Sequence, residues 1–395
     1  MSNTEGKSKR YTQTRNIDIR TFTMVAILIL LWLVFTFFTS NGFSNLGSSF
    51  ITARNLSNLS RQMAIVGIMG SSMTLVIVTG GIDLSAGVVA GFVGCMAAAM
   101  QVNAGFSTPL TILISFLAGA FIYLIQGSLI AYGNIVPFIV TLGGQLVFKG
   151  LILAVTRGQT IAPLKESLRY FGAAQVGKTV SVVIGIGVVV ILFLNELQKR
   201  ENKKKHGTLT ESLTKMLVRW GIMSVLLLGA IMIMNNYRGM PMPVLIMGVI
   251  VVILTLVAGR TTFGRSIYAI GGNLDAARYA GLRVKRNTVM VYIIHGVMVS
   301  IAGLILAARL NASPTTAANM NLELDAIAAA VIGGTSMSGG VGKVVGAILG
   351  ALIMATLDNG MSMLNMDAYW QFIAKGIILV AAVGLDIYTR NRKKK

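Results

Sequence analysis

Two glycine-rich breaks interrupt apolar runs of the sequence, and each contains polar side chains that could contact a solute inside a membrane. The break residues are Gly80, Gly81, Asp83 and Ser85 in the first, and Gly333, Gly334 and Ser338 in the second. Asp83 has two interpretations. Its carboxylate can cap the N–H groups of the helix that follows, or it can line a polar pathway, because acidic residues inside membrane segments are usually functional. Ser338 has the same two interpretations without the charge.

Both breaks read G-G-x-x-x-S-x-G, and each is followed by a stretch rich in Gly and Ala. A weaker echo joins Lys149-Gly150 to Lys375-Gly376. Internal duplication is common in transporters, so these echoes indicate two related halves, parallel or inverted.

The polar segment 260–286 contains the signals of a short helix. Asn273 can cap its start, Asp275 then lies in its first turn, and Gly281 can end it. Small residues on one face would let another protein approach closely. The alternative is a solvated helix that lies on the bilayer interface.

The sequence lacks the residue groups that catalysis or metal binding would require. His206 lies in a basic segment and His295 in an apolar run, and neither has a Glu or Cys at metal-ligand spacing. We expect His295 to be a hydrogen-bonded interior residue, with a proton relay as the alternative. Gly340-Val341-Gly342-Lys343 is not a phosphate loop, because Val344 follows the lysine and Met337 stands where the motif needs glycine. The single cysteine, Cys95, allows no internal disulfide. We therefore predict no metal, no cofactor and no ATP hydrolysis by this chain.

The elements that hold these residues are membrane helices. The 395 residues are 54% hydrophobic and only 12% charged, with a mean hydropathy of +0.75. This composition excludes a soluble enzyme, a disordered chain and a coiled coil. The apolar residues fall in runs of about 18–23, long enough to cross roughly 30 Å of hydrocarbon. We predict an all-α polytopic membrane protein.

Twelve apolar runs can be counted if the short run 325–334 crosses the membrane. The others lie at about 22–39, 63–80, 84–101, 109–131, 136–156, 179–196, 217–235, 242–259, 287–309, 341–358 and 370–388. With this count, the tails 1–21 and 389–395 and the loops 197–216 and 260–286 fall on the cytoplasmic side. Their lysines and arginines belong there by the positive-inside rule. The net charge of +21 therefore indicates topology and not nucleic-acid binding.

Several strings resemble one transport family. The string from Gly264 to Gly281 reads G-R-S-I-Y-A-I-G-G-N-L-D-A-A-R-Y-A-G. Its D-A-A-x-x-x-G core resembles the E-A-A-x-x-x-G motif of ABC importer permeases, with Asp275 in place of the usual Glu. Further matching strings are G-G-I-D-L-S at 80–85, V-P-F-I-V-T-L at 136–142, L-D-A-I-A-A at 324–329 and L-D-N-G-M at 357–361. The sequence from about 55 to 386 resembles the ribose/xylose branch of monosaccharide permeases. Its length, with an insertion at about 178–237, is similar to the xylose permease subgroup.

The resemblance implies a single permease domain over 22–388, with ten core helices and two inserted ones. It implies a separate ATPase subunit, an extracytoplasmic sugar-binding protein, a second permease copy and a monosaccharide substrate, best guessed as xylose. The implied ATPase-coupling residues are Gly271, Gly272, Asn273, Asp275, Ala276, Ala277, Arg278 and Gly281. Asn359 joins the break residues as a pathway candidate. The alternative is an ion-coupled secondary transporter with Asp83 and His295 as its proton relay.

Overall fold

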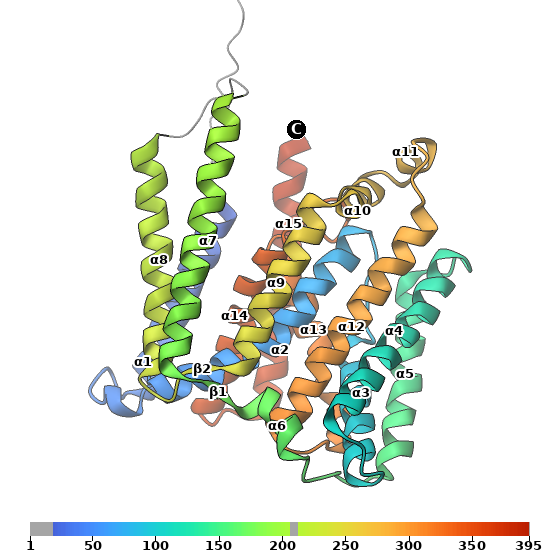
Figure 1. The fold of residues 1–395 in the computed structure, drawn as a ribbon, viewed down its shortest axis with the longest axis horizontal. Helices are drawn as coiled ribbons and strands as arrows, with labels where there is room; N and C mark the ends of the chain where they lie inside the picture. Colours follow the sequence, from blue (N-terminus) through green and yellow to red (C-terminus); the bar gives the residue numbers. More distant parts are fainter. Residues whose placement is uncertain (1–18, 206–211, 395) are drawn as a thin grey trace, which may run out of the picture.

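The computed structural model describes residues 19–205 and 212–394, which form a bundle of mostly upright helices (Figure 1). His206 and most of the tail 1–21 lie outside the described residues. The long helices are α1 (Ile19–Thr39), α2 (Ala53–Val78), α4 (Thr108–Ala131), α5 (Pro137–Thr156), α7 (Lys178–Lys205), α8 (Leu213–Asn235), α9 (Met242–Arg260), α12 (Val284–Leu310), α14 (Val344–Met363) and α15 (Ala368–Lys394). The shorter elements are η1 (Leu46–Ser48), α3 (Ala86–Val102), α6 (Glu166–Ala173), β1 (Gln175–Val176), β2 (Met240–Pro241), α10 (Thr262–Gly272), α11 (Leu274–Tyr279), η2 (Thr315–Asn319) and α13 (Leu322–Ile332).

Most of the predicted apolar runs form helices that are long enough to span a membrane. Among the described residues, eight helices are long and apolar enough to cross a bilayer, and α1, α3 and α15 contribute shorter apolar stretches. The run predicted at 325–334 is α13, whose 11 residues reach only about 16 Å at 1.5 Å per residue. An irregular stretch from Asn311 to Asn321, which contains the 3-10 helix η2, precedes α13. The all-α polytopic prediction is confirmed.

The core is built as an inverted repeat (Figure 1). Helices α2 and α12 run in opposite directions, and each is followed by a stretch without α-helix and then by a short helix, α3 or α13. Each short helix packs on the long helix of the other half. In α3, Gly94 lies against Gly303 of α12, and the Thr74 hydroxyl of α2 accepts a hydrogen bond from Thr335, just after α13.

The remaining core helices also pack on the long helix of the other half. Helix α4 packs antiparallel on α12, and α14 packs antiparallel on α2, where the Asn55 side chain donates to Asn359 Oδ1 at 2.7 Å. Lys149 and Lys375 lie on the equivalent helices α5 and α15. The two glycine strings, however, are not equivalent: 80–87 precedes α3, whereas 333–340 follows α13. The sequence echo between these strings is therefore not the repeat of the fold.

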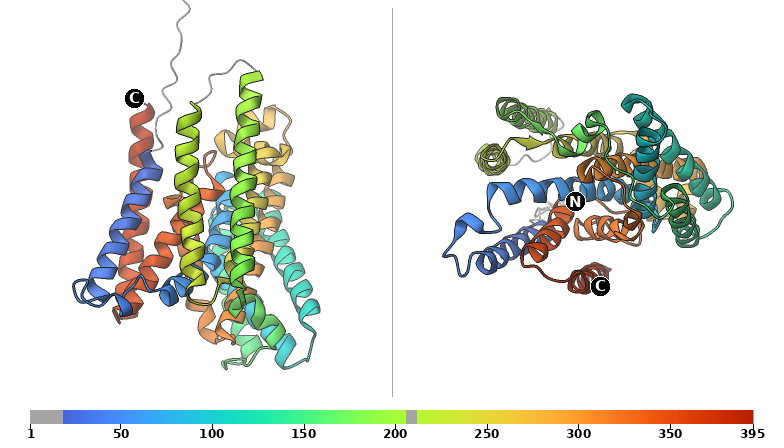
Figure 2. Two further views of the ribbon diagram at one scale, coloured as in Figure 1. Left: turned by 60° about the vertical axis from the view of Figure 1, so that its left-hand side comes forward. Right: turned by 90° about the horizontal axis from the view of Figure 1, so that it is seen from below.

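Helices α7 and α8 form a hairpin at the edge of the bundle (Figure 2). At its base, β1 pairs antiparallel with β2, with Gln175 opposite Pro241 and Val176 opposite Met240. Only 12% and 11% of the apolar windows of α7 and α8 are buried, against 83% for α2. The hairpin is therefore peripheral, and the core consists of α2, α3, α4, α12, α13 and α14.

Glycines set how closely the core helices approach. A Cβ atom at Gly296 of α12 would lie 2.5 Å from Tyr123 Cδ2 and would also overlap the backbone oxygen of Gly119. We expect Gly296→Leu to push α4 away from α12 and to destabilise the protein by at least about 1–3 kcal/mol, as overpacked cores do. The measurement is the melting temperature of the purified protein in detergent. Gly248→Leu is the matched control, because the space around Gly248 is open. Equal melting temperatures for the two variants would contradict this packing.

Candidate functional site

The predicted helix in 260–286 is present as α11, and its capping follows the prediction. Asn273 Oδ1 accepts a hydrogen bond from the N–H of Ala276 at 2.9 Å. Asp275 lies in the first turn. The chain leaves the helix through Gly281, whose φ of +74° suits glycine because it has no side chain to clash. Helix α10 precedes it, and its N-cap Thr261 accepts from the N–H of Gly264 at 2.9 Å.

Helix α10 rests directly on the ends of two membrane segments. Gly271 touches the backbone oxygen of Val78, the last residue of α2. The N–H of Gly340 donates to the same oxygen at 2.9 Å, and the Tyr268 hydroxyl donates to Gly342 O at 2.8 Å. A displacement of α10 must therefore act on α2 and on the loop between α13 and α14 together.

The other predicted coupling residues form an outward face. Gly272, Asn273, Asp275, Ala276 and Arg278 are exposed, and Ala277 is buried beneath them. Arg278 and Asp275 form an exposed ion pair with an N–O distance of 3.6 Å, which contributes little to stability. A groove of about 490 Å³ lies beside this face, between α10 and α12, and includes Arg283 and Arg286. The face offers backbone, small side chains and positive charge to a partner.

Asp83 is fully buried at the centre of a polar network. Its Oδ1 accepts from the Ser85 N–H and from the Ser85 hydroxyl, each at 2.7 Å. Its Oδ2 is bonded to the Tyr123 hydroxyl and lies 3.1 Å from His295 Nε2. His295 Nδ1 lies 2.8 Å from Ser72 Oγ. The prediction that His295 is a hydrogen-bonded interior residue is confirmed.

This network joins four elements and corrects the capping interpretation of Asp83. Ser85, not Asp83, is the N-cap residue of α3, and α3 has no side-chain cap. Asp83 instead ties the extended stretch before α3 to α4 and α12, while Gly80 turns the chain at a φ of +85°. Gly81 leaves room for the Tyr292 hydroxyl, which a Cβ would approach to 2.7 Å. Because all the residues that bind Asp83 are buried, the network holds the stretch 79–85 in place between α2 and α3.

The other pathway candidates lie elsewhere. Gly333, Gly334 and Ser338 are near the C-terminal end of α2, where Ser336 Oγ and Ser338 Oγ are 3.0 Å apart. Asn359 lies near the opposite end of α2, on its bond to Asn55. The structure therefore does not bring these residues together with Asp83.

Sequence reasoning missed a charged cluster that links α13, α14 and α15. Lys375 Nζ lies 2.9 Å from Asp325 Oδ2 and 2.8 Å from Asp358 Oδ1. Asp325 is 2% exposed and Lys375 is 18% exposed. The available signal was a charged residue in each of three successive apolar segments, since such residues usually pair inside a bundle. This cluster fixes α15 to the core.

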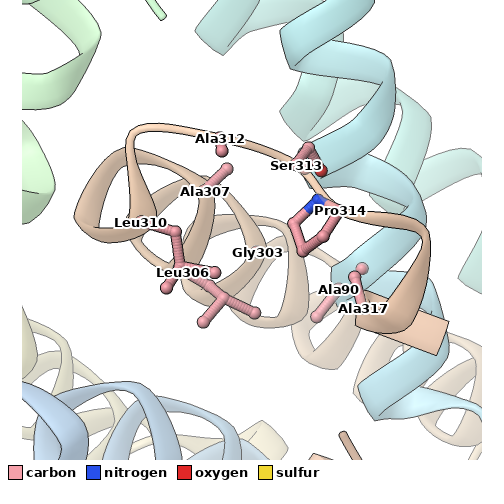
Figure 3. A pocket seen from close by; sticks show the side chains of 11 residues that line it. Ala90, Gly303, Leu306, Ala307, Leu310, Ala312, Ser313, Pro314 and Ala317 are labelled. Carbon is pink, nitrogen blue, oxygen red and sulfur yellow. The ribbon is translucent and has the colours of Figure 1, made fainter. Parts of the chain in front are cut away.

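The cavity in Figure 3 is a small packing cavity between helices and not a binding site. It lies between α3 and α12 and is lined by small and apolar residues, among them Ala90, Gly303 and Ala317. Its volume of about 10 Å³ is close to the minimum for one water molecule. It cannot hold a larger solute.

The charged cluster predicts that loss of Lys375 destabilises the protein and that removal of its two carboxylate partners restores the stability. We expect Lys375→Met to destabilise the protein by about 3 kcal/mol, because it leaves two carboxylates without their cation. The triple change Lys375→Met, Asp325→Asn, Asp358→Asn should recover most of this loss, since no unpaired charge remains. Thermal unfolding in detergent measures both effects. A single variant as stable as the parent, or a triple variant as unstable as the single, would contradict the role of this cluster.

Comparison with known proteins identifies the family. Residues 55–383 match the family described as "Branched-chain amino acid transport system / permease component". The chain is 41% identical over 382 residues to the xylose transport system permease protein of Escherichia coli (strain K12). The aligned residues are 97% of this chain and 95% of the relative. It is 39% identical over 382 residues to the xylose transport system permease protein of Haemophilus influenzae, and here the aligned residues are 96% of this chain and 99% of the relative.

A more distant relative is the ribose import permease protein of Bacillus subtilis (strain 168), 35% identical over 343 residues, which cover 87% of this chain and 88% of the relative. No solved structure matches the chain. The family model covers most of the chain, and the relatives extend nearly from end to end. This multi-pass membrane protein therefore belongs to the permease-component family, in the branch that includes the bacterial xylose and ribose permeases.

Proposed function

We propose that this chain is the membrane-spanning subunit of an ATP-driven importer that moves a monosaccharide, D-xylose, across the bacterial cytoplasmic membrane. The observation that supports this most is the 41% identity to a xylose permease over 97% of the chain. The built coupling face on α10 and α11 supports it independently, because a permease driven by another subunit needs such a contact.

The partners follow from the two ends of the bundle. An ATPase subunit docks on the outward face of α11 and the adjoining groove. The described ends of α1 and α15 lie on this same side (Figures 1 and 2), so we place both termini in the cytoplasm. Arg260, Arg265 and Arg278 are also on this side and agree with the positive-inside rule. A sugar-binding protein then docks at the opposite end, beside α6.

We further propose that two copies of the chain form the transporter. Residues 22–388 would be one permease domain, with 178–237 as a peripheral insertion and 260–286 as the coupling loop. Helices α5 and α15 have broad exposed apolar faces, and in a homodimer such faces would meet the second copy as well as lipid. The break residues then act as the joints on which the core changes between outward-facing and inward-facing states.

ATP-driven motion would enter the membrane domain through Gly271. When the ATPase subunits move, α10 would press on Val78 O and Gly340, and so on α2 and the 333–343 loop together. This geometry gives one mechanical input to both halves of the inverted repeat. Asn273 and Gly281 keep the docking helix in place during the movement.

The function is tested by reconstituting the chain with its ATPase and binding protein in liposomes. We expect labelled xylose to accumulate when ATP is inside the vesicles with the ATPase, and to be displaced by unlabelled xylose better than by ribose. Uptake should continue in the presence of an ionophore and should stop without ATP. Uptake that an ionophore abolishes, or ribose uptake that exceeds xylose uptake, would contradict the proposed energy source or substrate.

The coupling contact is tested by two matched valine variants. Gly271→Val should reduce both uptake and the sugar-stimulated ATPase rate by about tenfold or more, within the usual range of coupling between sites, because its side chain would overlap Val78 O. Gly248→Val should be close to the parent, since Gly248 lies in α9 outside the coupling face and the space around it is open. Both proteins should remain in the membrane at equal levels. Equal activity of the two variants would contradict transmission through Gly271.

A further inference from the structure

The two short helices of the inverted repeat begin at the same place. Gly87, in the first turn of α3, touches Glu323, in the first turn of α13. A Cβ at Gly87 would lie 2.8 Å from Glu323 N and 3.1 Å from Leu322 N. Gln145, which contacts Glu323, is near the middle of the membrane helix α5. The two helix starts therefore meet near mid-membrane, and the helices run from there toward opposite sides.

Neither helix start is capped by a side chain. Ser85 at the start of α3 and Asn321 at the start of α13 make no side-chain cap hydrogen bond. The first N–H groups of a helix have no partner within the helix and place partial positive charge at its start. Two such ends in one spot create a local set of hydrogen-bond donors in a region without bulk water.

Glu323 lies against this pair of helix starts with half of its carboxyl group unpaired. The residue is 3% exposed. Its Oε1 accepts from the Gln145 amide at 3.1 Å, whereas Oε2 is buried and has no hydrogen-bond partner in the part of the chain that the structure describes. Oε2 is also the atom that touches the Gly87 position. A buried acceptor without a donor is unfavourable, so this atom is suited to a ligand that donates.

The mixture of groups indicates which ligand fits. An anion would be repelled by the carboxylate of Glu323. A bare cation would need several oxygen ligands, and the described residues contain no group of three or more acidic, histidine or cysteine side chains that could hold one. A hydroxyl group donates one hydrogen bond and accepts two, so it can satisfy Oε2 and a helix N–H at once. The junction is therefore complementary to a neutral, polyhydroxylated solute.

We propose that the junction of α3 and α13, with Glu323 and Gln145, is the point at which hydroxyl groups of the transported sugar are bound as it crosses the membrane. Glu323 accepts from one hydroxyl, and the Gln145 amide turns from Glu323 to a neighbouring one. In this structure the junction is closed, because α5 covers it, with Leu146 and Val147 of α5 exposed outward. Separation of α5 from α13 opens it. This inference rests on the proposed function.

The test uses the complete transporter in liposomes and compares xylose with its singly deoxygenated analogues. The binding protein is the same for every permease variant, so a changed preference between two sugars must arise in the permease. We expect the parent to take up xylose at least about tenfold faster than one deoxy analogue, the usual effect of a hydrogen bond to a charged group. Glu323→Gln should lower xylose uptake and remove that preference. Glu201→Gln, an exposed change on α7, should keep both.

A labelling experiment covers the case in which Glu323→Gln is poorly folded. Gln145→Cys should react with a small thiol reagent in the ATP-bound complex, and xylose should slow this reaction. Thr214→Cys, exposed at the start of α8 in the peripheral insertion, should react at a rate that xylose does not alter. Cys95 is fully buried and can remain in place.

The outcomes separate this inference from the proposed function. If the parent transporter takes up no xylose or other monosaccharide, the proposed function fails. If the parent transports xylose but Glu323→Gln keeps both the rate and the sugar preference, the junction binds only water and the inference is wrong. Xylose-independent labelling of Gln145→Cys, in a transporter that is active, would overturn it as well.

Discussion

The need to satisfy every backbone hydrogen-bonding group inside the membrane governs this structure. In hydrocarbon, non-helical backbone is tolerated only where protein or a polar cavity surrounds it. Two stretches of this chain, 79–85 and 311–321, join core helices without forming an α-helix, and the second contains only the short 3-10 helix η2. The first is held by Asp83 and its partners. The second is held by a bridge between Ile161 and Ser313 and by the Asn311 side chain, which accepts from the N–H of Leu164 at 3.2 Å.

Close packing makes that protection possible. Where α3 meets α12, Gly303 touches the backbone of Ala90, and where α13 meets α14, Gly350 touches the backbone of Ala329. Helices in lipid gain no hydrophobic driving force from one another, so small residues that permit backbone contact provide much of their attraction. The same contacts keep water and lipid away from the extended stretches. The polar breaks and the glycine-lined helix contacts therefore act together, because close packing shields the non-helical backbone from lipid.

Much of this arrangement could be predicted from local sequence signals, and the remainder could not. Asn273 and Gly281 were correctly identified as helix ends because capping depends on residues only a few positions apart. The glycine strings 80–87 and 333–340 echo each other but lie at non-equivalent positions of the repeat, because glycine-rich strings recur in membrane segments, which are generally rich in Gly. The Lys375 cluster was missed because its members lie in three separate helices, and hydropathy describes each helix alone. The contact between Glu323 and Gly87 depends wholly on tertiary structure, and no spacing along the chain indicates it.

The exchange of short helices between the two halves has a consequence for biosynthesis. Helix α3 leaves the translocon long before α12, the helix on which it packs, has been translated. Until then, the Asp83 carboxylate lacks His295, which arrives 212 positions later in the chain. The first half must therefore wait in the bilayer with an unfinished polar segment, shielded by the insertion machinery or by transient contacts. Such non-local pairing slows folding, and it makes the last third of the chain the part that completes the first.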